Sequence, residues 1–355
     1  LPGATATAFT YDGTNWTAAP SMGTAGFSGE PAGSGTEALA ANFRAPPGVN
    51  RNTEEYNFSS STVTAGAWAS GGNLNTARRG GAPSTSGTQS LSFYAAGGPP
   101  ASNATEEYNG STWTTVNNTG NSVGMTAGAG TLTSGLLFGG ETPATPVSNI
   151  TEEYDGTNWT TGGTLGTGRR DLGGCGTSQT AGLAFGGAAT PGTSTSTEEY
   201  DGSSWTAGGA LPAAKRAPGS AGTQTAGLGF GGYATTILNT TEEYNGSSWT
   251  AGGNLTIAKS MSMGSGTQTA ALSSGGATPT YPYSPITDVQ GYDGTAWSTR
   301  PSLAISRGKG GGSGTQTAGL VFGGTTDNGS TFTTATEEFT PETVTANPAS
   351  NLSVS

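Results

Sequence analysis

Short apolar runs alternate with polar turn segments along the whole chain, and no window places apolar residues at helical spacing for even three turns. The stretch 151–187 shows this pattern most clearly. In it T-E-E-Y and W-T-T are joined by D-G-T-N, and the run A-G-L-A-F ends in Gly-Gly. β-Forming residues around an Asp-Gly turn are typical of a hairpin, and a short apolar run has the length of a buried strand. With a fourth strand expected within 170–176, this stretch predicts four short strands and no helix.

The same text returns along the chain, and its most regular marker is a Tyr followed by a Trp. The steps between successive tyrosines of these pairs are 45, 52, 46, 46, 44 and 48 residues. Four short strands in a unit of about 40–50 residues are the pattern of a propeller blade. We therefore expect an all-β, seven-bladed β-propeller with four antiparallel strands per blade. The seven pairs are Tyr11–Trp16, Tyr56–Trp68, Tyr108–Trp113, Tyr154–Trp159, Tyr200–Trp205, Tyr244–Trp249 and Tyr292–Trp297.

The repeat resembles the kelch-repeat family, whose blade combines an apolar strand ending in Gly-Gly, a Glu two residues before Tyr, a Trp and a basic residue. Those positions are filled here by Gly186, Gly187, Glu198, Tyr200, Trp205 and Arg216. The wording T-E-E-Y-(D/N)-G-S-S-W-T-A-G-G with G-T-Q-T-A-G-L-x-F-G-G is also similar to virion structural proteins of marine bacteriophages. The resemblance implies a kelch-like propeller in a tail, fibre or decoration protein.

Both chain ends are expected to share one blade. An eighth Tyr-type strand, Thr336–Phe339, has no Trp after it, whereas the hairpin 5–17 has no apolar strand before it. We therefore expect the strand that contains Trp16 to join the sheet of Ala318–Phe322. Which of 5–11 and 336–339 completes that blade stays open. The expected domains are a single propeller over 1–340 and a tail or attachment arm over 341–355.

The charged residues of the repeat predict structural ion pairs. Twelve glutamates form six Glu-Glu pairs, and neighbours on a strand point to opposite faces. That geometry argues against a catalytic pair of carboxylates, and a half-buried carboxylate needs a cation. The expected pairs join the first glutamates to basic residues of the same blade or the next one: Glu152, Glu198 and Glu242 with Arg169, Arg216 and Lys259.

Composition excludes several other functions. The chain has a net charge of −11, so electrostatic binding of nucleic acid or of anionic membranes is not expected. It contains no His, which removes the imidazole base of serine and cysteine nucleophiles and the copper ligands of a galactose-oxidase type of site. Its one cysteine, Cys175, is expected to be a small buried group. We expect no catalytic residue, metal or cofactor, and no insertion into a membrane.

Binding residues are expected in the loops between each Gly-Gly and the next Tyr, which vary most in length. Rigid aromatic side chains suit a binding surface, because they supply contact area at low entropic cost. Such residues are Tyr281 and Tyr283, which lie between prolines, together with Tyr233 and Phe332. The alternative is that they pad the scaffold or contact a neighbouring subunit.

These observations favour a non-enzymatic binding or adhesion module on a virion surface or in an extracellular setting. Its expected partners are other virion or surface subunits and a glycan or protein receptor on a host. The alternatives are a purely structural spacer of a particle and a carbohydrate-active enzyme that uses loop Asp or Glu.

Overall fold

The computed structural model describes residues 7–11, 15–19, 30–33, 37–41, 44–45, 48–49, 53–57, 60–278, 284–327 and 329–347. All regular structure in these residues is β-strand. Among the described residues there is no helix long and apolar enough to cross a membrane. By its contacts the chain divides into two units, Gly66–Pro341 and a discontinuous unit of Leu1–Ala65 with Glu342–Ser355. The boundary after Pro341 lies one residue from the expected one at 340, whereas Leu1–Ala65, expected within the propeller, belongs to the other unit.

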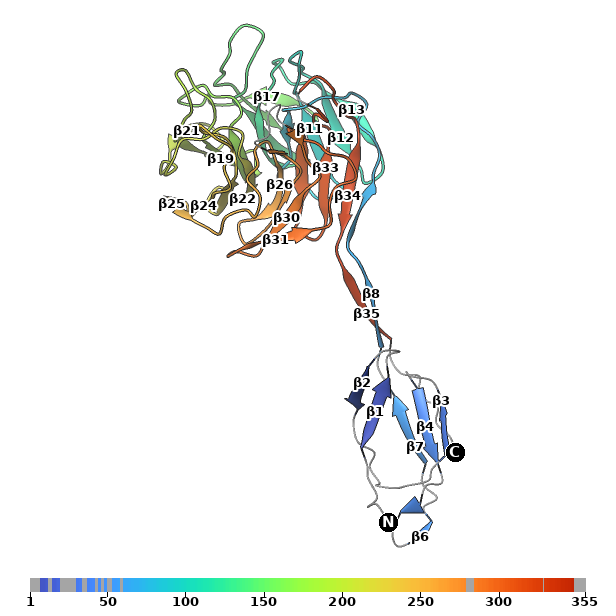
Figure 1. Ribbon diagram of the computed structural model, residues 1–355. Coiled ribbons are helices and arrows are strands. Elements are labelled where there is room, and N and C mark those ends of the chain that lie inside the picture. The colour runs from blue at the N-terminus through green and yellow to red at the C-terminus, as the bar shows by residue number, and fades with distance from the viewer. Residues whose placement is uncertain are drawn as a thin grey trace. The chain divides into compact units, whose positions relative to one another are not determined.

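The unit Gly66–Pro341 is a β-propeller (Figure 1). Its described strands form six four-stranded antiparallel sheets, which we call blades 1 to 6. Blade 1 is β10 (Ala82–Pro83), β11 (Ser92–Ala95), β12 (Thr105–Tyr108) and β13 (Trp113–Val116). Blade 2 is β14 (Ala127–Thr131), β15 (Ser134–Phe138), β16 (Thr151–Tyr154) and β17 (Trp159–Thr161). Blade 3 is β18 (Gly173–Ser178), β19 (Ala181–Phe185), β20 (Thr197–Tyr200) and β21 (Trp205–Ala207).

The second half of the ring has the same order, in which the first strand of each blade lies innermost. Blade 4 is β22 (Gly219–Gly222), β23 (Gly227–Phe230), β24 (Thr241–Tyr244) and β25 (Trp249–Ala251). Blade 5 is β26 (Met263–Thr267), β27 (Ala270–Ser274), β30 (Val289–Tyr292) and β31 (Trp297–Arg300). A small pair of strands, β28 (Ala277–Thr278) and β29 (Ser284–Pro285), lies between β27 and β30 in the sequence. Blade 6 is β32 (Gly311–Gly314), β33 (Gly319–Phe322), β34 (Thr336–Thr340) and β9 (Ala67–Ser70). The expected class and strand number per blade are confirmed, but the expected seven blades are wrong, since there are six.

The ring closes where β9 pairs with β34, in a register that places Trp68 opposite Phe339. The chain therefore enters the propeller on the outermost strand of blade 6 and leaves it on the neighbouring strand. The expected closure through Trp16 is wrong, because Trp16 lies in a hairpin of the other unit. The eighth Tyr-type strand does lack a Trp of its own, and the Trp that completes it is Trp68.

The unit at the chain ends contains the two repeat copies that do not form blades. Tyr11 pairs with Trp16 in a hairpin of β1 and β2, and Tyr56 lies on β7. Trp68 follows Tyr56 by 12 positions instead of the usual five, because this pair is divided between the two units. The strands of this unit are β1 (Ala8–Tyr11), β2 (Trp16–Ala19), β3 (Glu30–Gly33), β4 (Glu37–Ala41), β5 (Arg44–Ala45), β6 (Gly48–Val49), β7 (Thr53–Asn57), β8 (Ser60–Thr64) and β35 (Thr343–Asn347). They pair as β1–β2, β3–β4–β7, β5–β6 and β8–β35.

The propeller core consists of aromatic side chains packed between blades. In blade 3, Tyr200 and Trp205 lie with ring centroids 5.0 Å apart, and Trp205 also packs on Phe138 of blade 2 at 4.9 Å. Two polar groups fasten the same interface, since Tyr200 donates to Glu153 of blade 2 and the Trp205 indole donates to Thr151 at 2.9 Å. Each ring thus supplies apolar area and one directed hydrogen bond to the preceding blade.

The inner strands pack backbone against backbone, which explains their glycines. A Cβ added to Gly264 on β26 would lie 1.9 Å from the carbonyl oxygen of Ser220 on β22. Glycine is needed for a different reason at the end of the apolar strand, where Gly186 has a φ of 62° and a Cβ would meet the carbonyl oxygen of Lys215. Small residues thereby bring the inner strands close to a common axis.

Candidate functional site

A ring of six residues surrounds the propeller axis where each chain segment enters its inner strand. All six have a φ between 50° and 61°, and five of them are not glycine. Most donate their backbone N–H to the carbonyl oxygen of the equivalent residue in the preceding blade, as Asp171 does to Met125 at 2.9 Å and Ala217 to Asp171 at 2.6 Å. In blade 2 the donor is the next residue, Thr126, which bonds to Gly80 at 3.0 Å. We call these residues the axial ring: Gly80, Met125, Asp171, Ala217, Met261 and Lys309.

The backbone of the axial ring has a conformation that costs free energy. A left-handed φ is unfavourable for residues other than Gly, Asn and Asp, and costs of order 1–3 kcal/mol each. The circle of hydrogen bonds offsets this cost, and it is closed where the Gly80 N–H donates to the Lys309 carbonyl oxygen at 2.7 Å. Side chains on such a frame have fixed directions, which is a property of binding sites built on rigid scaffolds.

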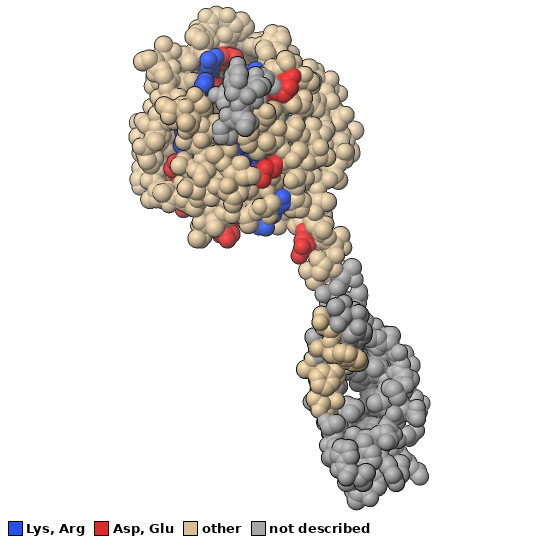
Figure 2. All heavy atoms as spheres, viewed as in Figure 1, with Lys and Arg blue, Asp and Glu red and all other residues tan. Residues whose placement is uncertain are grey.

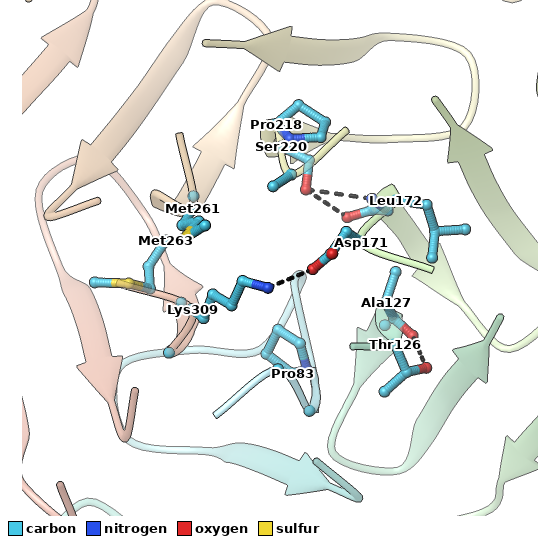
Figure 3. Close-up of a pocket in the computed structure, with 18 of the residues that line it drawn as sticks. Pro83, Thr126, Ala127, Asp171, Leu172, Pro218, Ser220, Met261, Met263 and Lys309 are labelled. Atoms are coloured by element: carbon cyan, nitrogen blue, oxygen red, sulfur yellow. Dashed lines mark hydrogen bonds and ion pairs between the residues drawn. The ribbon is translucent and has the colours of Figure 1, made fainter. Parts of the chain in front are cut away.

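One ion pair crosses the axis inside this ring. The Lys309 Nζ of blade 6 lies 2.7 Å from the Asp171 Oδ1 of blade 3, and the two side chains meet from opposite sides of the central opening (Figure 3). Burial would raise the pKa of the Asp171 carboxyl, but Lys309, Arg216 and Arg170 act in the opposite direction and hold that pKa below its ordinary value. Asp171 is therefore a carboxylate at neutral pH, surrounded by cations.

Two small cavities lie along the axis and share residues of the ring. The larger has a volume of about 100 Å3 and extends along the inner strands, where Pro83, Ser220 and Met263 contribute to its wall (Figure 3). The smaller, of about 60 Å3, is lined by Asp171, Arg216, Ala217, Tyr233, Ser260, Met261 and Lys309. We call the smaller one the mouth cavity, because Arg216 and Tyr233 belong to the segments that connect strands at this end of the blades.

The cations beside the mouth cavity have different partners. Arg170 pairs with Glu141, and Lys309 with Asp171. The Arg216 guanidinium lies over the Tyr233 ring, 5.0 Å from its centroid, and forms no ion pair within the described part of the chain. Charged side chains are otherwise sparse on the face of the propeller shown in Figure 2. Arg216 is thus a cation at this cavity without a carboxylate partner among the described residues.

Four of the six residues expected to form ion pairs do so, in a different combination. Glu198 binds Arg169 of its own blade at 2.7 Å, and Glu242 binds Lys215 at 2.5 Å. Arg216 does not reach Glu198, because it follows Lys215 on an extended segment and points toward Tyr233 instead. Lys259 binds Asp288 at 2.8 Å, since Gln290 replaces the first glutamate of that blade.

Glu152 has no cation within salt-bridge distance among the described residues. It accepts hydrogen bonds from the backbone of Gly120 at 2.6 Å and from the backbone and side chain of Asn121, both at 2.9 Å. The buried Val123 occupies the place that a basic residue takes in the other blades. Neutral donors therefore compensate this carboxylate where the cation is missing.

The predicted loop aromatics are only partly described. Tyr233 forms a wall of the mouth cavity, and Phe332 lies under the Arg79 guanidinium at 5.5 Å. Tyr281 and Tyr283 lie outside the described residues. The sequence analysis did not identify Asp171 as a site residue. Asp171 follows Arg169 by two residues, as Lys309 follows Arg307, and these two arginines occupy the same position of the repeat. Aligning the blades on that basic residue would have brought both into the axial ring.

The glutamate carboxylates that recur in the blades form ion pairs or hydrogen bonds that stabilise the fold. The first glutamates bind buried cations or backbone N–H groups, and the second ones accept from the tyrosines of the next blade, as Glu199 does from Tyr244 at 2.5 Å. In the described part of the chain no three His, Cys, Asp or Glu residues are grouped as metal ligands. The axis is the place where charge and cavity volume coincide.

Comparisons with known proteins give the fold only. No protein-family model matches the chain, and no curated protein matches it in sequence. A solved structure entitled "Structure of YjhT" superimposes with a TM-score of 0.63 at 13% sequence identity, and the match covers 78% of this chain and 99% of that one. This likeness supports the β-propeller architecture described above.

Proposed function

We propose that this chain is a non-enzymatic binding module of a virion or cell surface, in which a kelch-like propeller presents its axial face to a ligand or partner subunit. The observation that carries the proposal is the mouth cavity, where Arg216, Tyr233, Asp171 and Lys309 converge on a rigid backbone ring. Ligand sites combine a concave surface with a few polar groups of fixed direction, and this site has both.

The use of charged groups elsewhere in the blades supports binding rather than catalysis. Buried glutamates such as Glu198 and Glu242 are each bound to a cation, so they are poor general acids or bases. Glycoside hydrolysis uses two carboxyl groups roughly 5–10 Å apart, one of them with a raised pKa. The Asp171 carboxyl at the axis has a lowered pKa instead, and Lys309 binds it directly.

A glycan array probed with the full chain tests this proposal. We expect specific glycans to be retained by the wild type and lost by Tyr233→Ala, because Tyr233 forms a wall of the mouth cavity. Arg300→Ala is a control on an outer strand, β31, far from the axial ring. Retention of the same glycans by Tyr233→Ala, or their loss in Arg300→Ala, would place the binding surface elsewhere. An array without any retained glycan would favour a protein partner or the structural alternative.

A further inference from the structure

We propose that the mouth cavity binds one compact oxyanion, a carboxylate or a sulfate carried by the ligand, between Arg216 and Lys309. This inference rests on the proposed function for its ligand but on separate observations for its chemistry. The chain as a whole has a net charge of −11, so a site with an excess of positive charge at the axis is opposite in sign to the chain's net charge. The arguments are the balance of charges, the size of the cavity and the rigidity of its frame.

The charges around the cavity do not balance within the described residues. Three cations, Lys309, Arg216 and Arg170, act on the carboxylate of Asp171. Two of them have carboxylate partners of their own, Asp171 for Lys309 and Glu141 for Arg170. Arg216 is the cation left over, and a ligand oxyanion would supply its missing partner. Arginine suits this role, because its planar fork of N–H groups matches the oxygens of a carboxylate or sulfate.

The size of the cavity selects a terminal group rather than a whole sugar ring. A volume of about 60 Å3 corresponds to roughly four to six positions for a water molecule, at about 10–15 Å3 each. A carboxylate or a sulfate fits this space, whereas a pyranose does not. The ligand would therefore insert one charged group at the axis and leave its remaining part over the connecting segments.

The frame of the site is fixed before the ligand arrives. The Arg216 guanidinium lies over the ring of Tyr233, and Lys309 is paired with Asp171. Both cations stand on segments tied into the axial ring, where Ala217 donates to Asp171 at 2.6 Å and Lys309 to Met261 at 2.9 Å. A site with so little freedom loses little entropy on binding. Asp171 remains as a counter-charge that would repel anions too large to avoid it.

The test is an NMR titration of the full chain with sodium sulfate and, separately, sodium acetate, at constant ionic strength maintained with sodium chloride. We expect saturable shifts of the Arg216 side-chain N–H and of the Lys309 amide with one of the two anions. Arg216→Ala should weaken the affinity by roughly tenfold or more, as expected for the loss of a hydrogen bond to a charged group. Arg300→Ala should leave it unchanged, and Arg216→Lys should give an intermediate affinity. The anion that saturates at the lower concentration identifies the class of group.

The outcomes separate this inference from the proposed function. Shifts that rise linearly with both anions, or equal affinity in Arg216→Ala and wild type, would overturn the oxyanion site even if the array retained glycans. Saturable binding that depends on Arg216 would support the site even if the array retained none. A fold check by unfolding temperature accompanies each variant, and Arg216→Lys keeps the test decisive if Arg216→Ala does not fold.

Discussion

The two glutamates of each Glu-Glu pair have different partners, because adjacent residues of a strand face opposite sides of the sheet. Glu198 binds Arg169 within blade 3, whereas Glu199 accepts a hydrogen bond from Tyr244 of blade 4 at 2.5 Å. One carboxylate thus fixes the loop that enters its own blade, and the other fastens the next blade.

Removal of the first carboxylate should be costly. Arg169 is fully buried, so Glu198→Ala would leave an uncompensated charge, and we expect a loss of about 3–5 kcal/mol in the free energy of unfolding. Urea denaturation of the variant against wild type measures it. Glu342→Ala, at an exposed carboxylate, should change stability by no more than about 0.5 kcal/mol. Equal effects of the two changes would show that the ion pair does not contribute.

The hydrogen bond between the second glutamate of a pair and the tyrosine of the next blade should make the protein less stable at alkaline pH. Burial and the hydrogen bond to the preceding blade's glutamate raise the pKa to about 12 for Tyr108, Tyr200, Tyr244 and Tyr292. In the unfolded chain these phenols ionise near a pH of about 10. Because the folded state retains protons that the unfolded state has lost, stability is complete below the unfolded pKa and falls as pH rises from 10 towards 12. Unfolding temperatures and tyrosinate absorbance across this range check it; native tyrosines that ionise at their ordinary pKa would contradict it.

The opposite facing of the two glutamates could be predicted from strand periodicity alone. The choice between Arg169 and Arg216 could not be predicted, because each follows a Gly-Gly segment in its own repeat and only the three-dimensional path decides which one reaches Glu198. The axial position of Asp171 was hidden for a similar reason. A single Asp in a loop has no periodic partner, and Lys309 stands 138 residues away.

At the level of strands, the interface of blades 5 and 6 lacks the Tyr–Glu hydrogen bond that joins the other blades. Blade 6 has Phe339 in place of the tyrosine, and blade 5 has Gly291 in place of the second glutamate, so donor and acceptor are absent together. Blade 5 also has Val289 where other blades have threonine, and the Trp68 indole donates to the Pro301 carbonyl oxygen at 2.9 Å instead. Losing both partners of a buried hydrogen bond costs far less than losing one.

This interface makes a double-mutant prediction. Phe339→Tyr alone buries a hydroxyl without its usual acceptor and should destabilise the propeller by about 1–3 kcal/mol. Adding Gly291→Glu should recover much of that loss by supplying the acceptor, with the Arg300 side chain moving aside, since its Nε would lie 2.5 Å from the new Cβ. Thermal unfolding of the two single variants and the double variant measures the coupling. Strictly additive effects would mean that no hydrogen bond forms.

The strands themselves were predictable, because Tyr, Trp and Gly-Gly recur at nearly fixed offsets in blades 1 to 5, and blade 6 keeps Gly-Gly with Phe339 in place of the Tyr. The number of blades was not. The hairpin of Tyr11 and Trp16 has the same paired register as the hairpins inside the propeller, and its text Y-D-G-T-N-W-T is identical to that of blade 2. It is not a blade hairpin because β1 and β2 form a two-stranded sheet of their own within the other unit, and no local pattern carries that information. The local indications were the missing apolar strand before this hairpin and the longer spacing between Tyr56 and Trp68.

For the whole molecule, the closure through β9 distinguishes two tryptophans with the same place in the repeat. Trp68 packs on Phe339 with ring centroids 5.2 Å apart, whereas Trp16 is 69% exposed and lies in the other unit. Trp68→Ala should lower the stability of the propeller by about 3 kcal/mol. Trp16→Ala should leave the unfolding of the propeller unchanged. Calorimetry of both variants tests this, and a propeller transition shifted equally by the two would contradict the six-bladed closure.

The pairing of β9 with β34 also decides how the propeller would respond to a pulling force. The chain enters at Ala67 and leaves at Thr340, and these two residues are direct partners across the antiparallel pair. A load applied between the two entry points would therefore open the pair like a zipper, one rung at a time. Shear would have loaded all rungs at once. Once β9 has peeled away, blade 6 loses its outer strand, and the ring has an open seam from which further blades can detach in turn. The same geometry confines the first opening to this one strand pair, while the six interfaces between blades bear no load until it has parted.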